Sequence, residues 1–202
     1  MSIRVPSILA ASADEYVAGI VRTPDQAVEL AANAVAAGRT KIAAIEADDA
    51  LSFDDRTARI GEARSMGEAI AQAAGRRFAR MRQEHYEAAR RRLETPPQGI
   101  DAIDAAEVAR SSRDALARAE DTGPDGELAA FYQRAWRTGD RIAQRAALST
   151  AMARRDLGVI VRYRDDHPLE VTAVDEFLDA DRRVHDVATL LAERLQFGVT
   201  LP

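Results

Sequence analysis

The sequence predicts an all-α protein, and three observations carry this prediction. The chain of 202 residues contains 42 alanines and only 5% aromatic residues, a composition with high helix propensity and little apolar area per residue. Apolar residues recur at helical spacing over long stretches. Net charge alternates along the chain as −3, +3, −4, +5 and −6, over residues 1–50, 51–94, 95–126, 127–164 and 165–202. We expect an elongated bundle or long hairpin of about five helices, whose neighbouring segments attract one another.

The first long helix is predicted over residues 24–48. The Thr23 hydroxyl can cap free backbone amides, and Pro24 suits the first helical position, where no backbone donor is needed. One seam of apolar and small residues then steps by three or four positions, as in a coiled coil. The seam consists of Val28, Ala31, Val35, Gly38, Ile42 and Ile45.

A second and longer helix is predicted over residues 53–94. Ser52 and Asp55 resemble a capping box at its start. At 1.5 Å per residue this helix would be about 63 Å long, which exceeds the width of a compact domain of this size. Gly75 lies inside it, so we expect either one continuous helix or a kink or break at that glycine.

Two breakers divide the rest of the chain. The first is residues 95–99, with two consecutive prolines, and it precedes a helix that reaches about Asp121. The second is residues 122–126, with two glycines and a proline, after which a helical pattern continues as far as Met152.

Residues 159–163 leave two alternatives open. They are β-branched and aromatic and follow a glycine, as a strand would, and residues 3–5 and 197–201 have the same extended character. Because three such short pieces make only a marginal sheet, continued helix is favoured over a minor short-strand element. A last amphipathic helix is predicted from residue 171 to about 196.

We expect these helices to form a single domain over residues 1–202, with extended terminal arms and a sub-boundary at residues 95–99. The chain has no cysteine, which excludes disulfides and thiolate chemistry. It also has no signal-peptide pattern and no apolar run of about 18 residues, so the sequence predicts no membrane partner and a cytoplasmic location.

Motifs for common enzyme chemistry are missing from the sequence. It contains no phosphate-binding Gly-x-x-x-x-Gly-Lys, no Gly-x-Gly-x-x-Gly and no Gly-x-Ser-x-Gly. Asp181 and His185 share a helix face, and residues 165–167 (Asp-Asp-His) offer further metal ligands, but an acid–imidazole contact and helix capping explain both groups. We therefore predict no catalytic residue, no metal site, no cofactor and no enzymatic activity.

The function that we predict is assembly or adaptor work through helix contacts and terminal arms, with a protein partner or by self-association. A structural or scaffold component of a larger particle, such as a bacteriophage head, would use these features. The predicted partner-binding residues of the arms are Ile3, Val5, Ile8, Leu9, Phe197, Val199 and Leu201.

The alternative is a helical nucleic-acid-associated protein that uses a basic segment from Arg76 to Arg92. The segment carries Arg76, Arg77, Arg80, Arg82, Arg90, Arg91 and Arg92, and Arg154, Arg155, Arg162 and Arg164 would form a second patch. These arginines spread around the helix, however, and the net charge of the chain is −5. Pairing with acidic helices or with another subunit is therefore favoured over nucleic acid.

Overall fold

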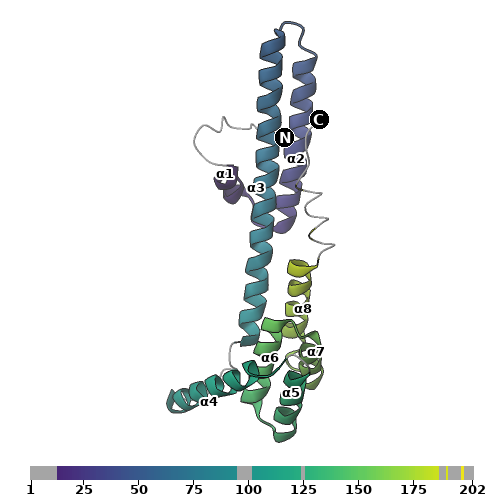
Figure 1. The fold of residues 1–202 in the computed structure, drawn as a ribbon. Coiled ribbons are helices and arrows are strands. Elements are labelled where there is room, and N and C mark those ends of the chain that lie inside the picture. The colour runs from purple at the N-terminus through teal and green to yellow at the C-terminus, as the bar shows by residue number, and fades with distance from the viewer. Residues whose placement is uncertain (1–12, 95–101, 124–125, 187–189, 191–196, 198–202) are drawn as a thin grey trace. The chain divides into compact units, whose positions relative to one another are not determined.

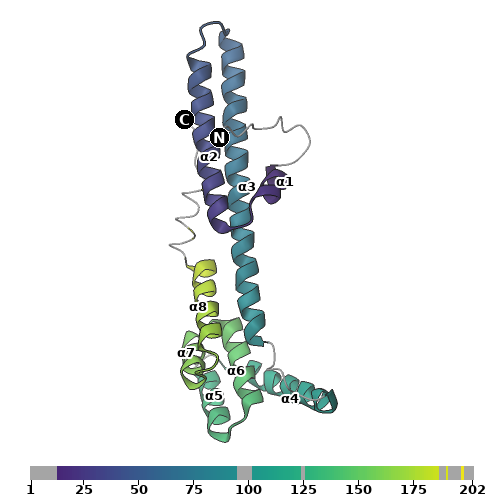
Figure 2. The same cartoon turned by 180° about the vertical axis from the view of Figure 1, so that it is seen from behind.

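The computed structural model confirms the all-α class. It describes residues 13–94, 102–123, 126–186, 190 and 197, and within these ranges the chain forms eight helices and no strand (Figure 1, Figure 2). The helices are α1 (Ala13–Ile20), α2 (Pro24–Glu46), α3 (Phe53–Glu94), α4 (Ala102–Glu120), α5 (Glu127–Thr138), α6 (Arg141–Arg154), α7 (Leu157–Asp166) and α8 (Val171–His185). The predicted number of about five is too low, because several short helices begin and end at caps of their own.

Contacts divide the chain into two compact units. Unit 1 comprises residues 1–85 and 182–202, and unit 2 comprises residues 86–181. The sequence indicates a sub-boundary at residues 95–99, which lie outside the described residues, whereas the division falls earlier, inside α3. A helix can change its packing partners without any break in its backbone hydrogen bonds, so no proline or glycine marks this point.

Unit 1 is built on α2 and α3, which lie side by side and antiparallel in both views (Figure 1, Figure 2). A complete capping box starts α2: the Gln26 amide donates to the Thr23 hydroxyl over 3.3 Å, and the Thr23 amide donates to the Gln26 side chain over 3.2 Å. At the start of α3 the Asp55 amide donates to the Ser52 hydroxyl over 3.1 Å. Both predicted helix starts are therefore confirmed.

The α3 helix is continuous through Gly75, and the structure shows what this glycine does. A Cβ added there would lie 2.8 Å from the Cβ of Phe197 and 2.9 Å from its Cγ. Phe197 is buried, and its ring centroid lies 5.4 Å from that of Phe78. Gly75 thus makes room for an aromatic side chain from the C-terminal segment, which is a packing role and not a kink.

The short helix α1 (Ala13–Ile20) completes unit 1 and was not expected from the sequence. Its first turn carries Asp14 and Glu15, and the Arg22 guanidinium donates to the carbonyls of Ala18 and Gly19 over 2.7 and 2.9 Å, which satisfies free acceptors at its end. Val17 is fully buried in the cluster that α1 shares with α2 and α3.

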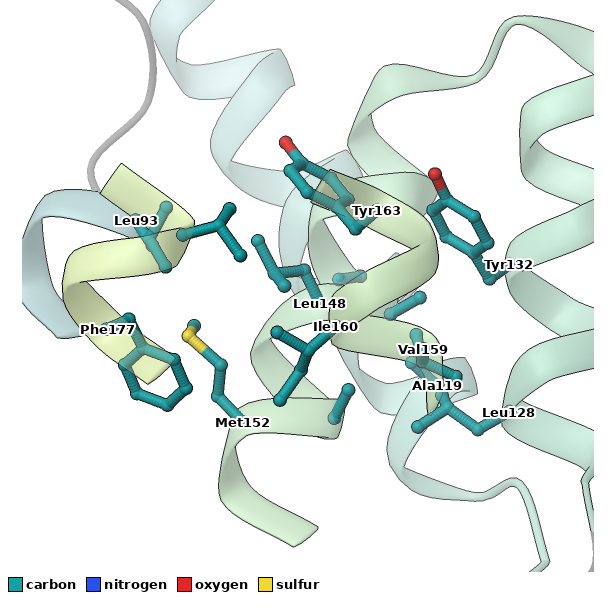
Figure 3. Packing of buried hydrophobic residues seen from close by; sticks show 14 of the residues in the cluster. Leu93, Ala119, Leu128, Tyr132, Leu148, Met152, Val159, Ile160, Tyr163 and Phe177 are labelled. Carbon is teal, nitrogen blue, oxygen red and sulfur yellow. The ribbon is translucent and has the colours of Figure 1, made fainter. Parts of the chain in front are cut away.

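Unit 2 surrounds α6 with α4, α5, α7 and parts of α3 and α8. Its core holds the six largest fully buried side chains among the described residues (Figure 3). These are Tyr132, Tyr163, Phe177, Leu148, Met152 and Ile160. Burying one side chain of this kind contributes about 1.5–3 kcal/mol to the free energy of folding. The core of unit 2 is therefore built from large apolar side chains, as in most globular domains.

The helical pattern predicted up to Met152 is interrupted once. Gly139 adopts φ 70° and ends α5, and Asp140 caps α6 by accepting the Ala143 amide over 3.0 Å. A left-handed glycine followed by a capping aspartate reverses the chain although the apolar spacing continues across it.

Residues 159–163 are helical, so a strand at this place is wrong. Asp156 caps α7 by accepting the Val159 amide over 3.2 Å, and Val159, Ile160 and Tyr163 are buried in the core of unit 2. The β-branched and aromatic residues reflect burial here and not an extended backbone. The other two pieces of the minor sheet, residues 3–5 and 198–201, lie outside the described residues, and residue 197 is assigned as helix.

Candidate interaction surfaces

The basic segment Arg76 to Arg92 lies on the second half of α3, and most of its arginines pair with carboxylates of the same chain. Three of these pairs stay within α3: Arg77 with Glu84, Arg90 with Glu94 and Arg91 with Glu87. Two others join helices: Arg76 with Asp14 and Arg92 with Glu176, the latter at 2.6 Å. Arg82 is also engaged, and Arg80 acts electrostatically on Asp14.

The pair between Asp14 and Arg76 ties α1 to α3. It is bidentate, with Nε to Oδ1 at 2.9 Å and Nη2 to Oδ2 at 3.0 Å. The hydrogen bond from Arg76 lowers the pKa of Asp14, and the nearby charges of Arg76 and Arg80 act in the same direction. Both side chains are about half exposed, so this pair orients α1 more than it stabilises the fold.

The basic block 127–164 pairs in the same way with the acidic block 165–202. Arg145 contacts Glu170 at 2.9 Å, and Arg164 contacts Asp175 at 2.6 Å. The hydrogen bonds from Arg164 raise its pKa still further above its ordinary value. The alternation of charge seen in the sequence is therefore satisfied in part inside the chain, and it leaves less charge for an outside partner.

The second predicted patch of arginines is also occupied. Arg154 donates to the Glu120 carbonyl over 2.6 Å, and Arg162 donates to Asp166 over 3.0 Å. Arg155 forms a bidentate pair with Asp181, at 3.2 and 3.0 Å. Within the described residues, then, neither arginine patch is a free row of cations.

The histidine and aspartate groups that could suggest a metal have other roles. The Asp181 carboxylate is buried against Arg155. The Asp166 carboxylate accepts a hydrogen bond from the Tyr132 hydroxyl over 3.0 Å. His167 packs against aromatic rings from α5 and α7. In the part of the chain that the structure describes, no group of three or more potential ligands could hold a metal ion.

From Ala32 to Ala44, one side of α2 carries exposed small residues and no charge, and sequence reasoning had missed it; Asp25 and Glu29 continue the same side towards the start of the helix. We call this side the alanine face. Its residues are all exposed and lie within one third of the helix circumference at 100° per residue: Ala32, Asn33, Ala36, Thr40, Ala43 and Ala44. The opposite side of α2, with Ala31, Ile42 and Ile45, is buried against the rest of unit 1. The signal was present in the sequence, because alanine recurs at helical spacing on both sides of this helix.

Of the predicted arm residues, only Phe197 lies in the described part of the chain. It is buried against α3 in the core of unit 1, where it serves the chain's own packing. The remaining arm residues, Ile3, Val5, Ile8, Leu9, Val199 and Leu201, lie outside the described residues.

Comparison with protein-family models, with curated proteins and with solved structures found no match. Among the described residues, no helix is both long and apolar enough to cross a bilayer.

Proposed function

We propose that the protein is a non-enzymatic assembly protein that associates with a second copy through the alanine face of α2. Such a role fits a structural or scaffold component of a larger particle, for example a bacteriophage head. The observation that carries the proposal is the exposed stretch from Ala32 to Ala44 on one side of α2, which has no charge in a chain of which 30% of residues are charged.

The desolvation cost of covering this face is small. Ala36 and Ala43 have no polar side-chain atoms, the Thr40 hydroxyl donates within the helix to the Ala36 carbonyl over 3.1 Å, and the Asn33 amide can exchange its hydrogen bonds with water for bonds across the contact. Small side chains also let two helices approach closely, which increases the dispersion contacts per residue. A solvent-exposed helix with no outside partner would normally carry Glu, Lys or Arg at these positions.

The charges around the alanine face favour an antiparallel pair of α2 helices. Asp25 and Glu29 lie in the first half of α2, Arg39 and Lys41 lie in the second half, and Glu46 is its last residue. Antiparallel pairing places the acidic half of each helix beside the basic half of its partner, whereas parallel pairing places like charges together. The same patch then serves both copies, as a twofold interface requires.

Nucleic acid is the weaker candidate. Affinity for a duplex comes mostly from cations that neutralise phosphates, and most arginines of both patches are already engaged within the chain. Binding to nucleic acid would therefore have to break several internal ion pairs.

The experiment is light scattering coupled to size-exclusion chromatography over a range of protein concentrations. The wild type should show a mass that rises towards twice the chain mass, and Ala36→Arg should remain a monomer because it buries a charge at the centre of the contact. The matched control is Ala58→Arg, at an exposed alanine of α3 outside the face, which should associate like the wild type. A wild type that stays monomeric throughout, or equal behaviour of both variants, would refute the proposal.

A charge exchange tests the orientation. Glu29→Lys and Lys41→Glu should each weaken association, because each places like charges beside one another in the antiparallel pair. The double variant should recover it, since the two opposite charges then meet again with their signs reversed. Loss of association in the double variant as well would contradict antiparallel pairing.

A further inference from the structure

Unit 2 contains a cavity that the assembly role does not use. Its volume is about 380 Å³, which lies within the range of small-molecule sites. Residues of α4, α6 and α7 line it, together with the end of α3 and the turn before α8. All of these residues belong to unit 2, so the site is complete within that unit.

Much of the cavity wall is apolar. Val108 and Leu116 come from α4, and Ile142 and Ala146 come from α6. Packing between α4 and α6 therefore leaves a space whose sides can cover a hydrocarbon chain or ring.

Among the described residues on the polar side of the cavity, one cation has no carboxylate partner. Arg145 is neutralised by Glu170 at 2.9 Å and also donates to the Leu93 carbonyl over 2.7 Å. Glu94 is neutralised by Arg90 at 2.8 Å. Arg141, by contrast, makes no ion pair or hydrogen bond with the described residues, although it lines the same cavity.

A histidine with a free nitrogen lies on the same wall. His167 stacks on Tyr163 with ring centroids 4.0 Å apart, and the edge of Trp136 lies 5.5 Å away. Its Nε2 is buried and has no hydrogen-bond partner. Burial lowers the pKa of His167, and Arg141 and Arg145 act in the same direction, while Glu170 and Asp166 oppose them. The imidazole is therefore mainly neutral near pH 7 and adds no second positive charge to the cavity wall.

From these contacts we infer that the cavity binds a small monocarboxylate with an apolar body. The Arg141 guanidinium holds the carboxylate, and the α4 and α6 side chains cover the hydrocarbon part. One free cation does not match a polyphosphate, and a ligand of a bound metal is not expected because the described residues offer no metal-binding group.

Octanoate is the probe for this inference, measured by isothermal titration calorimetry at pH 7. Octylamine and 1-octanol have the same chain with a positive or an uncharged head. The wild type should bind octanoate saturably, with one site per chain, and should bind both analogues at least tenfold more weakly. No saturable octanoate binding, or equal binding of octylamine, would overturn the inference.

Two variants locate the site. Arg141→Gln should weaken octanoate binding at least tenfold, and Ser112→Phe, which places a ring in the cavity from the exposed side of α4, should abolish it. Arg137→Gln removes an exposed arginine of α5 outside the cavity and should bind like the wild type. Equal losses in Arg141→Gln and Arg137→Gln, or full binding in Ser112→Phe, would place the ligand elsewhere.

The inference is independent of the proposed association through α2. Ala36→Arg should therefore bind octanoate with unchanged affinity even where it is a monomer. If binding fails while association persists, only the ligand site is refuted, and the reverse result refutes only the assembly proposal.

Discussion

The two units of this protein use different means to stay folded. Unit 2 buries tyrosine, phenylalanine, leucine, methionine and isoleucine around α6, whereas unit 1 contributes only Val17 and Val21 to the ten largest fully buried side chains among the described residues. Five of the nine residues in the main cluster of unit 1 are alanine. Since an alanine buries little apolar area, unit 1 depends more on helix propensity and caps than on its core.

This difference indicates which unit buries enough apolar surface by itself and which unit would gain burial from a partner. Unit 2 buries enough apolar side chains in its own core. Its surface is therefore charged, and many of its arginines pair with carboxylates of the same unit. Unit 1 has a small core and an exposed alanine face on α2, and a second helix against that face would add the burial that its own core lacks. Five measurements test whether the two units differ in this way.

The largest expected effect is truncation in the core of unit 2. Phe177 is fully buried, contacts the ring of Tyr86 with centroids 5.6 Å apart, and lies beside Met152 in Figure 3. Phe177→Ala should lower the free energy of unfolding by about 3–5 kcal/mol, measured by chemical denaturation. The control Leu169→Ala, at a side chain that is 99% exposed, should change it by less than about 0.5 kcal/mol. If Val21→Ala in unit 1 costs as much as Phe177→Ala, the contrast between the units fails.

The next effect concerns the buried carboxylate of unit 2. The Asp181 side chain is only 6% exposed and depends on the bidentate contact with Arg155, which itself adopts φ 57°. Arg155→Gln should cost about 1–3 kcal/mol, because it removes the cation that lies beside a buried carboxylate. Arg76→Gln removes an equally short but exposed pair in unit 1 and should cost less than about 1 kcal/mol. Equal costs in thermal unfolding would show that burial does not separate these pairs.

Two glycines of α3 should respond to alanine with opposite signs. Gly61 has open space around it, so Gly61→Ala should raise stability by about 1 kcal/mol through helix propensity. At Gly75 the new Cβ would overlap Phe197, so Gly75→Ala should lower stability by about 1–3 kcal/mol despite the same gain in propensity. Phe197→Ala should remove most of the penalty at Gly75 in a double-mutant cycle. A stabilising Gly75→Ala in the wild-type background would show that Phe197 does not pack there.

The smallest effect is a dependence on pH in unit 2. The pKa of His167 is lowered from its ordinary value of 6.5, so the unfolded chain binds the proton more readily than the folded one. Stability should fall as pH drops through about 6.5 towards the folded pKa, and it should be unaffected above that range. Thermal unfolding between pH 5 and 8 should show this slope in the wild type and a shallower one in His167→Asn. An identical slope in both proteins would assign the effect to other groups.

Much of this fold follows from local signals in the sequence. Thr23 with Pro24 and Ser52 with Asp55 fix the starts of α2 and α3, because a cap needs only residues close in the chain. Gly139 was overlooked although its signal is equally local, since the apolar spacing that continues past it masks the turn. The strand alternative at residues 159–163 shows the opposite problem, because burial and β-propensity select the same residue types.

The candidate sites depend on contacts that the sequence does not specify. In the sequence the arginines of α3 form a basic patch. In the structure, Asp14 and Glu176, which are distant in sequence, pair with Arg76 and Arg92. The cavity near Arg141 exists only because α4, α6 and α7 meet there. The alanines of the alanine face are visible in the sequence. Because alanine recurs on both sides of α2, the structure is needed to show which side is buried and which is exposed.

The most direct test of the central claim is amide hydrogen exchange in α2 and α6 measured at increasing protein concentration. If unit 1 gains burial by association, protection in α2 should rise with concentration in the wild type, while protection in the fully packed α6 stays constant. In Ala36→Arg the protection of α2 should not change with concentration. Protection in α2 that is high and independent of concentration in both proteins would contradict the account.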